Sequence, residues 1–149
     1  MKIVVDTNII FSALLNSNRT IGDILLSPDL SFEFYSCNYM RYEIQKHWER
    51  LKTISKLSDG QLDVSFAHII SKLKFINEEI IPAETWLEAE QLTKDIDIDD
   101  VDFVALTKFL YATLWTGDKM LYNGLKKINF EKIVNTTELL ELSMLKNKK

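Results

Sequence analysis

The sequence predicts one α/β domain over residues 1–149, in which a mainly parallel sheet lies between helices on both of its faces. A length of 149 residues suits a single domain. Apolar residues make up 46% of the chain, which is enough to build a core. Short β-branched segments alternate with longer helical patterns, and this alternation is typical of parallel sheets covered by helices.

Short apolar segments that end at polar or turn residues predict the strands. The first, residues 3–5, is β-branched and stops at Asp6, and residues 32–36 alternate between apolar and polar side chains. The other predicted strands are 80–81, which stops at Pro82, 113–115 and 133–134.

Apolar residues spaced three or four apart predict the helices. In residues 38–55 this stripe consists of Met40, Ile44, Trp48 and Leu51. The predicted helices are 9–15, 20–26, 38–55, 62–75, 83–94, 99–111, 119–125 and 136–145. The last four residues, Lys-Asn-Lys-Lys, are expected to form a disordered basic tail.

Charge is distributed unevenly along the chain. The formal net charge is −4, which argues against a protein held to nucleic acid by overall positive charge alone. Residues 78–102 contain ten acids and one base, whereas residues 41–56 contain five bases and two acids. We therefore expect a basic surface beside an acidic one.

Several classes of protein are excluded by what the chain lacks. Cys37 is the single cysteine, so no internal disulfide can form and a reducing, cytoplasmic location is expected. No apolar run is long enough for a membrane span, and no glycine-rich nucleotide motif or nucleophile elbow is present. His47 and His68 lack cysteine partners, so a structural zinc site is not expected.

Acidic residues occupy the places where a parallel sheet holds its ligands. Asp6 follows the first predicted strand and Asp118 follows 113–115, while Asp99, Asp100 and Asp102 open the helix before that strand. Crowded carboxylates are costly unless they are protonated or bind cations, and oxygen ligands favour Mg²⁺ or Mn²⁺. Such ions can activate water against a phosphodiester.

Each acid also has a purely structural explanation. Asp6 is a good helix N-cap, and Asp118 follows a glycine as turn residues do. Glu43 lies off the apolar stripe, with Lys46 and His47 three and four residues later, so a solvated ion pair accounts for it.

The three acids before the long apolar helix are assigned different roles. We expect Asp99 to be the N-cap, Asp100 a metal ligand and Asp102 an outer-sphere acid. Basic residues on the helix that carries Glu43 are candidates for contacts with RNA phosphates: Arg41, Lys46 and Arg50, with Lys52 beside them.

Taken in order, these residues resemble the PIN domain family. The resemblance rests on Asp6-Thr7-Asn8, Glu43, Asp100 and Thr116-Gly117-Asp118, and above all on the blocks VVDTNIIFSALL and DFVALTKFLYATLWTGDKML. It implies a compact α/β/α endoribonuclease that depends on one or two Mg²⁺ or Mn²⁺ ions and leaves 5′-phosphate and 3′-hydroxyl ends. Many bacterial members are VapBC-type toxins of type II toxin–antitoxin pairs and are usually dimeric.

The resemblance implies a role for each site residue. Asp6, Glu43, Asp100 and Asp118 would be both catalytic residues and metal ligands, and Thr7, Asn8, Thr116 and Asp102 would support them. The implied partners are RNA, a cognate antitoxin and a second copy of the chain. Two alternatives stay open: a non-catalytic module that binds RNA or protein, and a housekeeping nuclease of RNA processing. Nothing in the sequence indicates the RNA target.

Overall fold

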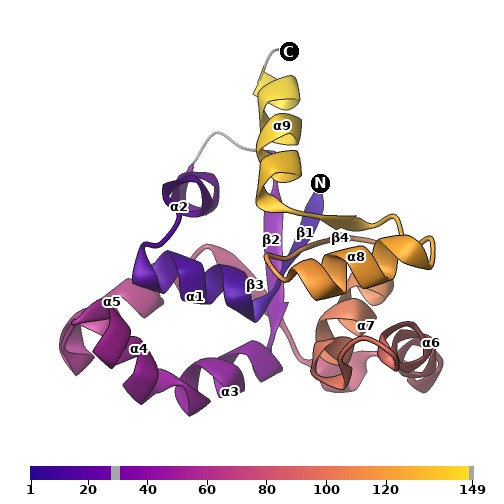
Figure 1. The fold of residues 1–149 in the computed structure, drawn as a ribbon, viewed down its shortest axis with the longest axis horizontal. Helices are drawn as coiled ribbons and strands as arrows, with labels where there is room; N and C mark the ends of the chain where they lie inside the picture. Colours follow the sequence, from indigo (N-terminus) through magenta and orange to yellow (C-terminus); the bar gives the residue numbers. More distant parts are fainter. Residues whose placement is uncertain (28–30, 148–149) are drawn as a thin grey trace.

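The computed structural model describes residues 1–27 and 31–147, and its centre is a parallel five-stranded sheet (Figure 1). The strands are β1 (Lys2–Val5), β2 (Glu33–Cys37), β3 (Leu73–Ile76), β4 (Thr113–Trp115) and β5 (Ile133–Val134). Their order across the sheet is β3-β2-β1-β4-β5, and every neighbouring pair is parallel. The predicted α/β class with a parallel sheet is thus confirmed.

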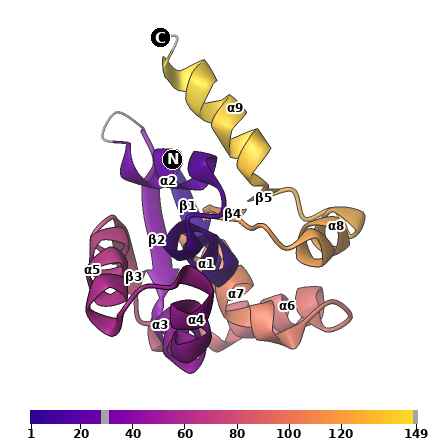
Figure 2. The same cartoon turned by 60° about the vertical axis from the view of Figure 1, so that its left-hand side comes forward.

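Helices cover both faces of this sheet (Figures 1 and 2). They are α1 (Thr7–Leu15), α2 (Arg19–Leu26), α3 (Asn38–Lys46), α4 (Trp48–Ser55), α5 (Asp59–Ile70), α6 (Ala83–Thr93), α7 (Val101–Leu110), α8 (Lys119–Lys127) and α9 (Thr136–Asn147), with 3₁₀ turns η1 (Glu78–Ile80) and η2 (Ile98–Asp100). Helix α7 packs against β1, β2 and β4, with α6 beside it, and α1 packs with α5 on the opposite face.

The core lies on both sides of β1, because this strand is the middle of the sheet. Ile3, Val4 and Val5 are fully buried, as expected for a continuous apolar strand in a parallel sheet. Trp115 on β4 and Phe103 on α7 are the largest fully buried side chains, so Trp115 has a packing role.

The order of the strands creates a switch point between β1 and β4. From β1 the chain moves outward to β2 and β3, then crosses back over the sheet to β4 and continues to β5. Ligands of open α/β sheets bind beyond the carboxyl ends of the two strands at such a point. Residues that directly follow β1 and β4 therefore occupy the favoured place for a site.

The helix predicted over residues 38–55 is two helices that meet at His47. The His47 N–H donates to the carbonyls of both Glu43 and Ile44, and its φ of −105° and ψ of 15° leave the helical range. The bend lets α4 pack on α1, where the His47 ring meets the Phe11 ring edge-on at 5.6 Å. Tertiary packing thus overrides a continuous apolar stripe.

The helix predicted over residues 62–75 is wrong in its last part. Helix α5 ends at Ile70, and Leu73–Ile76 forms β3, which pairs with β2. The alternation of Leu73, Lys74 and Phe75 carries the strand pattern, but it directly follows an apolar helix. Periodicity alone does not resolve such a short junction.

Three smaller predictions also need correction. Residues 80–81 do not form a strand, because the Asn77 side chain accepts a hydrogen bond from Glu79 N and starts the η1 turn. The helix predicted over 99–111 consists of η2 followed by α7. Helix α9 continues through Asn147, so the first two residues of the expected tail are helical, and residues 148–149 lie outside the described residues.

Candidate metal centre at the carboxyl edge of the sheet

Asp6 is buried at the switch point, directly after β1. Its N–H donates to the carbonyl of Trp115 at 3.1 Å, which ties the end of β1 to the end of β4. Its Oδ2 accepts hydrogen bonds from Thr116 Oγ1 at 2.7 Å and from Asn8 Nδ2 at 3.3 Å. Although Asp6 occupies the N-cap position of α1, its side chain makes no capping hydrogen bond. Capping therefore does not account for this acid.

Asn8 and Thr116 join the two loops that follow β1 and β4. The Asn8 amide donates to Thr116 Oγ1 at 3.3 Å, and its Oδ1 accepts from Gly117 N at 3.0 Å. Thr116 Oγ1 also accepts from Asp118 N at 3.0 Å. These bonds hold both loops in one arrangement around the Asp6 carboxylate.

Glu43 reaches the same edge from α3. Its Oε1 accepts a 2.6 Å hydrogen bond from Thr7 Oγ1, the residue that follows Asp6. The sequence alternative for Glu43 was an ion pair with Lys46, three residues later. Lys46 does lower the pKa of Glu43, but burial outweighs this effect and the pKa is raised.

Asp118 has the capping role that its sequence neighbours indicated. Its Oδ1 accepts from Met120 N at 2.9 Å and from Leu121 N at 3.2 Å at the start of α8. This cap uses one carboxylate oxygen and also fixes the orientation of the other. Capping and metal ligation are thus compatible at this residue.

Asp100 carries a buried oxygen that has no partner within the described part of the chain. Its Oδ2 is buried without a hydrogen bond, and the side chain does not cap α7. The cap of the preceding η2 turn is Asp97, whose Oδ1 accepts from Asp99 N at 2.9 Å. The expectation that Asp99 is the N-cap is therefore wrong.

The pKa values show that these acids crowd together. Burial first, then the charges of Asp6, Asp97, Asp118 and Glu43, raise the pKa of Asp100 to about 8. Burial is also the largest cause that raises the pKa of Asp6 to about 7, against the hydrogen bond from Thr116. Carboxyl groups with such values are costly to ionise near neutral pH without a cation.

Asp102 lies on α7, two residues after Asp100, and belongs to a second cluster of side chains. Its carboxylate, Cys37 Sγ and a Glu78 oxygen lie within 4.8 Å of one another. Burial, followed by the charge of Glu78, raises the pKa of Asp102 to about 6. Glu78 accepts from Asn38 N at 3.2 Å and Tyr39 N at 2.9 Å, so it caps α3. The positions of Cys37, Glu78 and Asp102 in the sequence do not indicate that these three side chains lie together.

Most of the candidate RNA-binding cations are engaged elsewhere. The Arg41 guanidinium lies 4.0 Å from the centre of the Phe75 ring, and Lys52 pairs with Glu49 and Asp59, each at 3.0 Å. Of the predicted cations, Lys46 is the one whose charge acts on Glu43.

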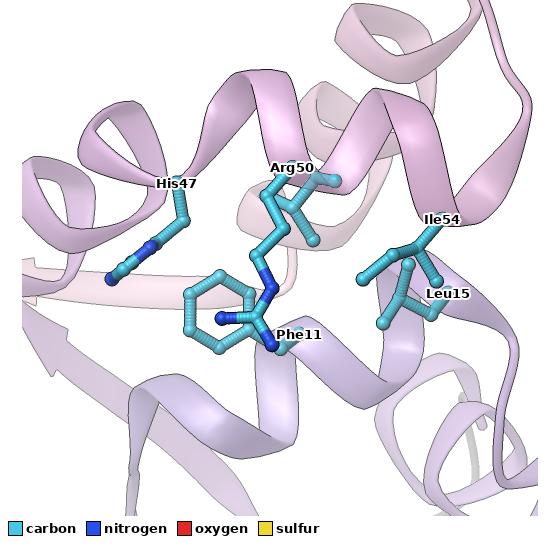
Figure 3. Close-up of a pocket in the computed structure, with 6 residues that line it drawn as sticks. Phe11, Leu15, His47, Arg50 and Ile54 are labelled. Atoms are coloured by element: carbon cyan, nitrogen blue, oxygen red, sulfur yellow. The ribbon is translucent and has the colours of Figure 1, made fainter.

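Arg50 lines a pocket between α1 and α4 (Figure 3). The pocket has a volume of about 240 Å³ and an apolar wall of Phe11, Leu15, Leu51 and Ile54, with His47 beside it. In Figure 3 the Arg50 side chain extends from α4 toward Phe11. Arg50 therefore lies beside an apolar wall.

The residues at the switch point fit a hard divalent cation. The available donors are carboxylate oxygens, which suit Mg²⁺ and Mn²⁺. The partnerless Asp100 Oδ2 and the raised pKa values of Asp6 and Asp100 fit carboxylates that share a bound cation. Across the described residues, none of the helices has the length and apolar composition that crossing a bilayer requires.

The fold and the side chains at the carboxyl edge of its sheet thus define an α/β protein with an acidic cluster at its switch point. The profile of the PIN domain matches residues 4–143, and the chain belongs to the PIN domain family. None of the curated proteins compared with the chain matches it.

Three solved structures share the fold. VapBC2 from Rickettsia felis, bound to a promoter DNA fragment, aligns with a TM-score of 0.66 at 18% identity, over 91% of this chain and 98% of that one. VapBC-1 from nontypeable Haemophilus influenzae gives 0.65 at 14% identity, over 92% and 99%. A toxin–antitoxin complex from Klebsiella pneumoniae gives 0.59 at 14%, over 89% and 96%.

Proposed function

We propose that this protein is a divalent-metal-dependent endoribonuclease that hydrolyses RNA phosphodiester bonds. The observation that carries the proposal is the buried, partnerless Asp100 Oδ2 among the charges of Asp6, Asp118 and Glu43. An acidic cluster of this kind is destabilising in an apo protein and is offset when a cation binds. Membership in the PIN domain family supports the same class of reaction.

We assign the ligands by their free oxygens. Asp6 and Asp100, with the free oxygen of Asp118 and with Glu43, would hold one or two Mg²⁺ or Mn²⁺ ions. When bound, such ions lower the pKa of a coordinated water and stabilise charge on the phosphate oxygens. Thr116 and Asn8 hold the Asp6 carboxylate, and Thr7 holds Glu43, so these side chains orient the ligands.

Asp102 is an outer acid in this proposal. It lies in the first turn of α7, and the charges of Glu78 and Glu43 both contribute to its raised pKa. Lys46 lowers the pKa of Glu43, so its charge acts on the acidic cluster. Lys46 is therefore the first candidate for a contact with an RNA phosphate.

The first test is cleavage of labelled total RNA by the full chain in Mn²⁺, with and without EDTA. Asp100→Asn and Asp6→Asn should each abolish cleavage, whereas Asp95→Asn, an exposed acid of the same acidic segment, should retain it. Equal cleavage by wild type and Asp100→Asn would reject the proposal. A folded protein that binds RNA without cutting it would instead be the non-catalytic module.

We further propose that the chain is the toxin of a toxin–antitoxin pair. The matched structures are toxin–antitoxin complexes, and the pocket between α1 and α4 offers apolar walls beside Arg50, which suits an amphipathic segment carrying an acid. Expression of wild type should arrest growth, Asp6→Asn should not, and co-expression of a small neighbouring reading frame should restore growth. Normal growth with active enzyme would indicate a housekeeping nuclease.

Two further expectations accompany this proposal. A homodimer should appear as twice the monomer mass in sedimentation, and activity should remain in the soluble fraction of cells. Sedimentation is measured on the purified wild-type protein, and fractionation is measured on the cells that express it.

A further inference from the structure

A second cavity opens beside Asp118, between α8 and α9. It has a volume of about 260 Å³ and is lined by Thr116, Gly117, Asp118, Lys119, Tyr122, Asn135, Thr136 and Thr137. These residues follow β4 and β5, which are adjacent parallel strands, so the cavity continues the same carboxyl edge that holds the acids. Figure 1 shows α8 and α9 on either side of the chain that passes through β5.

Asn135 lines this cavity, and its side-chain N–H groups have no acceptor among the described residues. Its Oδ1 accepts from Glu138 N at 2.9 Å, and its own N–H donates to Glu138 Oε1 at 3.1 Å, so α9 is capped from within. No residue in the described part of the chain accepts from Asn135 Nδ2, which leaves two donors available. The neighbouring Thr136 hydroxyl is already occupied, because it accepts from Trp115 Nε1 at 3.0 Å.

Tyr122 supplies an aromatic wall that is held in place. The interaction of its hydroxyl with Glu138 raises the pKa of Tyr122, and Lys126 Nζ lies 5.7 Å from the ring centre. Lys119 is exposed at the mouth of the cavity. A stacking ring, an amide with free donors and a nearby cation are the groups by which proteins hold single-stranded RNA.

We propose that this cavity is a nucleotide subsite that holds one nucleotide of the RNA strand next to the phosphate being cleaved. The Tyr122 ring stacks on the base, and the Asn135 amide donates to the base edge. A volume of 260 Å³ lies just below the roughly 300–1,000 Å³ typical of drug-sized ligands, which suits one monomer unit. The inference rests on the proposed ribonuclease function, but its test needs neither metal nor cleavage.

The test is a titration of the ¹⁵N-labelled full chain, without metal, with each of the four ribonucleoside 5′-monophosphates and with ribose 5-phosphate. We expect shifts of the Asn135 side-chain amide and of the Tyr122 and Thr137 backbone amides with at least one nucleotide. Ribose 5-phosphate should leave these signals in place. The side-chain amides of Asn123 and Asn129, which do not line the cavity, are internal controls.

Two pairs of variants identify the recognising groups. Tyr122→Leu should weaken nucleotide binding about tenfold, whereas Tyr122→Phe, which keeps the ring, should not. Asn135→Ser keeps a residue that caps helices well and should reduce discrimination among the four nucleotides, while Asn123→Ser on α8 should change nothing. Thermal melts verify that all four variants fold.

Two results would overturn the subsite. One is the absence of any nucleotide-dependent shift around the cavity; the other is an equal response to ribose 5-phosphate, which would reveal a bare phosphate site. If RNA cleavage persists in either case, only the subsite fails. If cleavage is absent but the nucleotide shifts are present, the proposed catalysis fails, and the cavity is a nucleotide-binding site without a role in cleavage.

Discussion

Thr7 Oγ1 donates a 2.6 Å hydrogen bond to Glu43 Oε1, which joins the residue after Asp6 to the acid on α3. A single hydroxyl therefore sets where the Glu43 carboxylate lies relative to Asp6. Glu43 lies on a helix, whereas Asp6 follows a strand of the sheet. Loss of this bond would therefore change the position of one acid relative to the other.

We expect Thr7→Val to weaken Mn²⁺ binding by about 10- to 100-fold, because a carboxylate without its orienting donor is a poorer ligand. Thr7→Ser keeps the hydroxyl and is the matched control. Isothermal calorimetry measures both affinities. Equal Mn²⁺ affinity for wild type and Thr7→Val would show that the Thr7 hydrogen bond does not orient a metal ligand.

Metal binding should depend steeply on pH. Asp6 and Asp100, with pKa values of about 7 and about 8, must lose their protons before they can bind a cation. The affinity for Mn²⁺ should therefore rise by roughly tenfold or more between pH 6 and pH 8. Calorimetry in buffers of different ionisation enthalpy should also reveal proton release. A pH-independent affinity would contradict these raised pKa values.

Without metal, the wild-type protein should become less stable as the pH rises. The pKa of Asp6 is raised from 3.8 to about 7 on folding, so the folded chain holds a proton that the unfolded chain has lost between these values. The associated stability is fully present below pH 3.8 and is lost as the pH rises through about 7.

Asp6→Asn removes this titration and provides the corresponding test. In EDTA at pH 8 the variant should melt at a higher temperature than wild type, and its melting temperature should change less between pH 5 and pH 8. Millimolar Mn²⁺ should raise the melting temperature of wild type and leave that of Asp6→Asn nearly unchanged. Parallel pH profiles for the two proteins would contradict the prediction.

Glu78 should be a stability residue, because its carboxylate accepts from Asn38 N and Tyr39 N at the start of α3. Glu78→Ala should cost about 1–2 kcal/mol in the free energy of unfolding. The control is Glu79→Ala, since the Glu79 side chain is exposed next to it. Urea denaturation measures both, and equal losses would show that the cap contributes nothing specific.

The sequence predicted the parts of the fold whose pattern is local. The β-branched run at residues 3–5 and the segment at 113–115 are strands because each is apolar and bounded by polar residues. The sequence places residues 73–75 in a helix because the partner of this strand, β2, lies far away in the sequence. The bend at His47 depends on packing against α1, which no local pattern contains.

The same distinction applies to the site. The acids at strand ends could be found by position, since Asp6 directly follows β1 and Asp118 comes three residues after the end of β4, at the switch point. The assignment of Asp99 as N-cap failed because four acids compete within six residues, and only geometry selects Asp97. The contact of Cys37 with Glu78 and Asp102 depends on three separate segments, so spacing does not show it.

The hydrogen bond between Asp6 and Thr116 spans 110 residues of chain. A polypeptide emerging from the ribosome exposes Asp6 almost at once, but it cannot close the acidic cluster until Thr116 and Asp118 have also emerged and β4 has docked beside β1. The site is thus among the last parts of the molecule to form during synthesis. The proposed metal site would thereby be completed only after most of the chain has been synthesised.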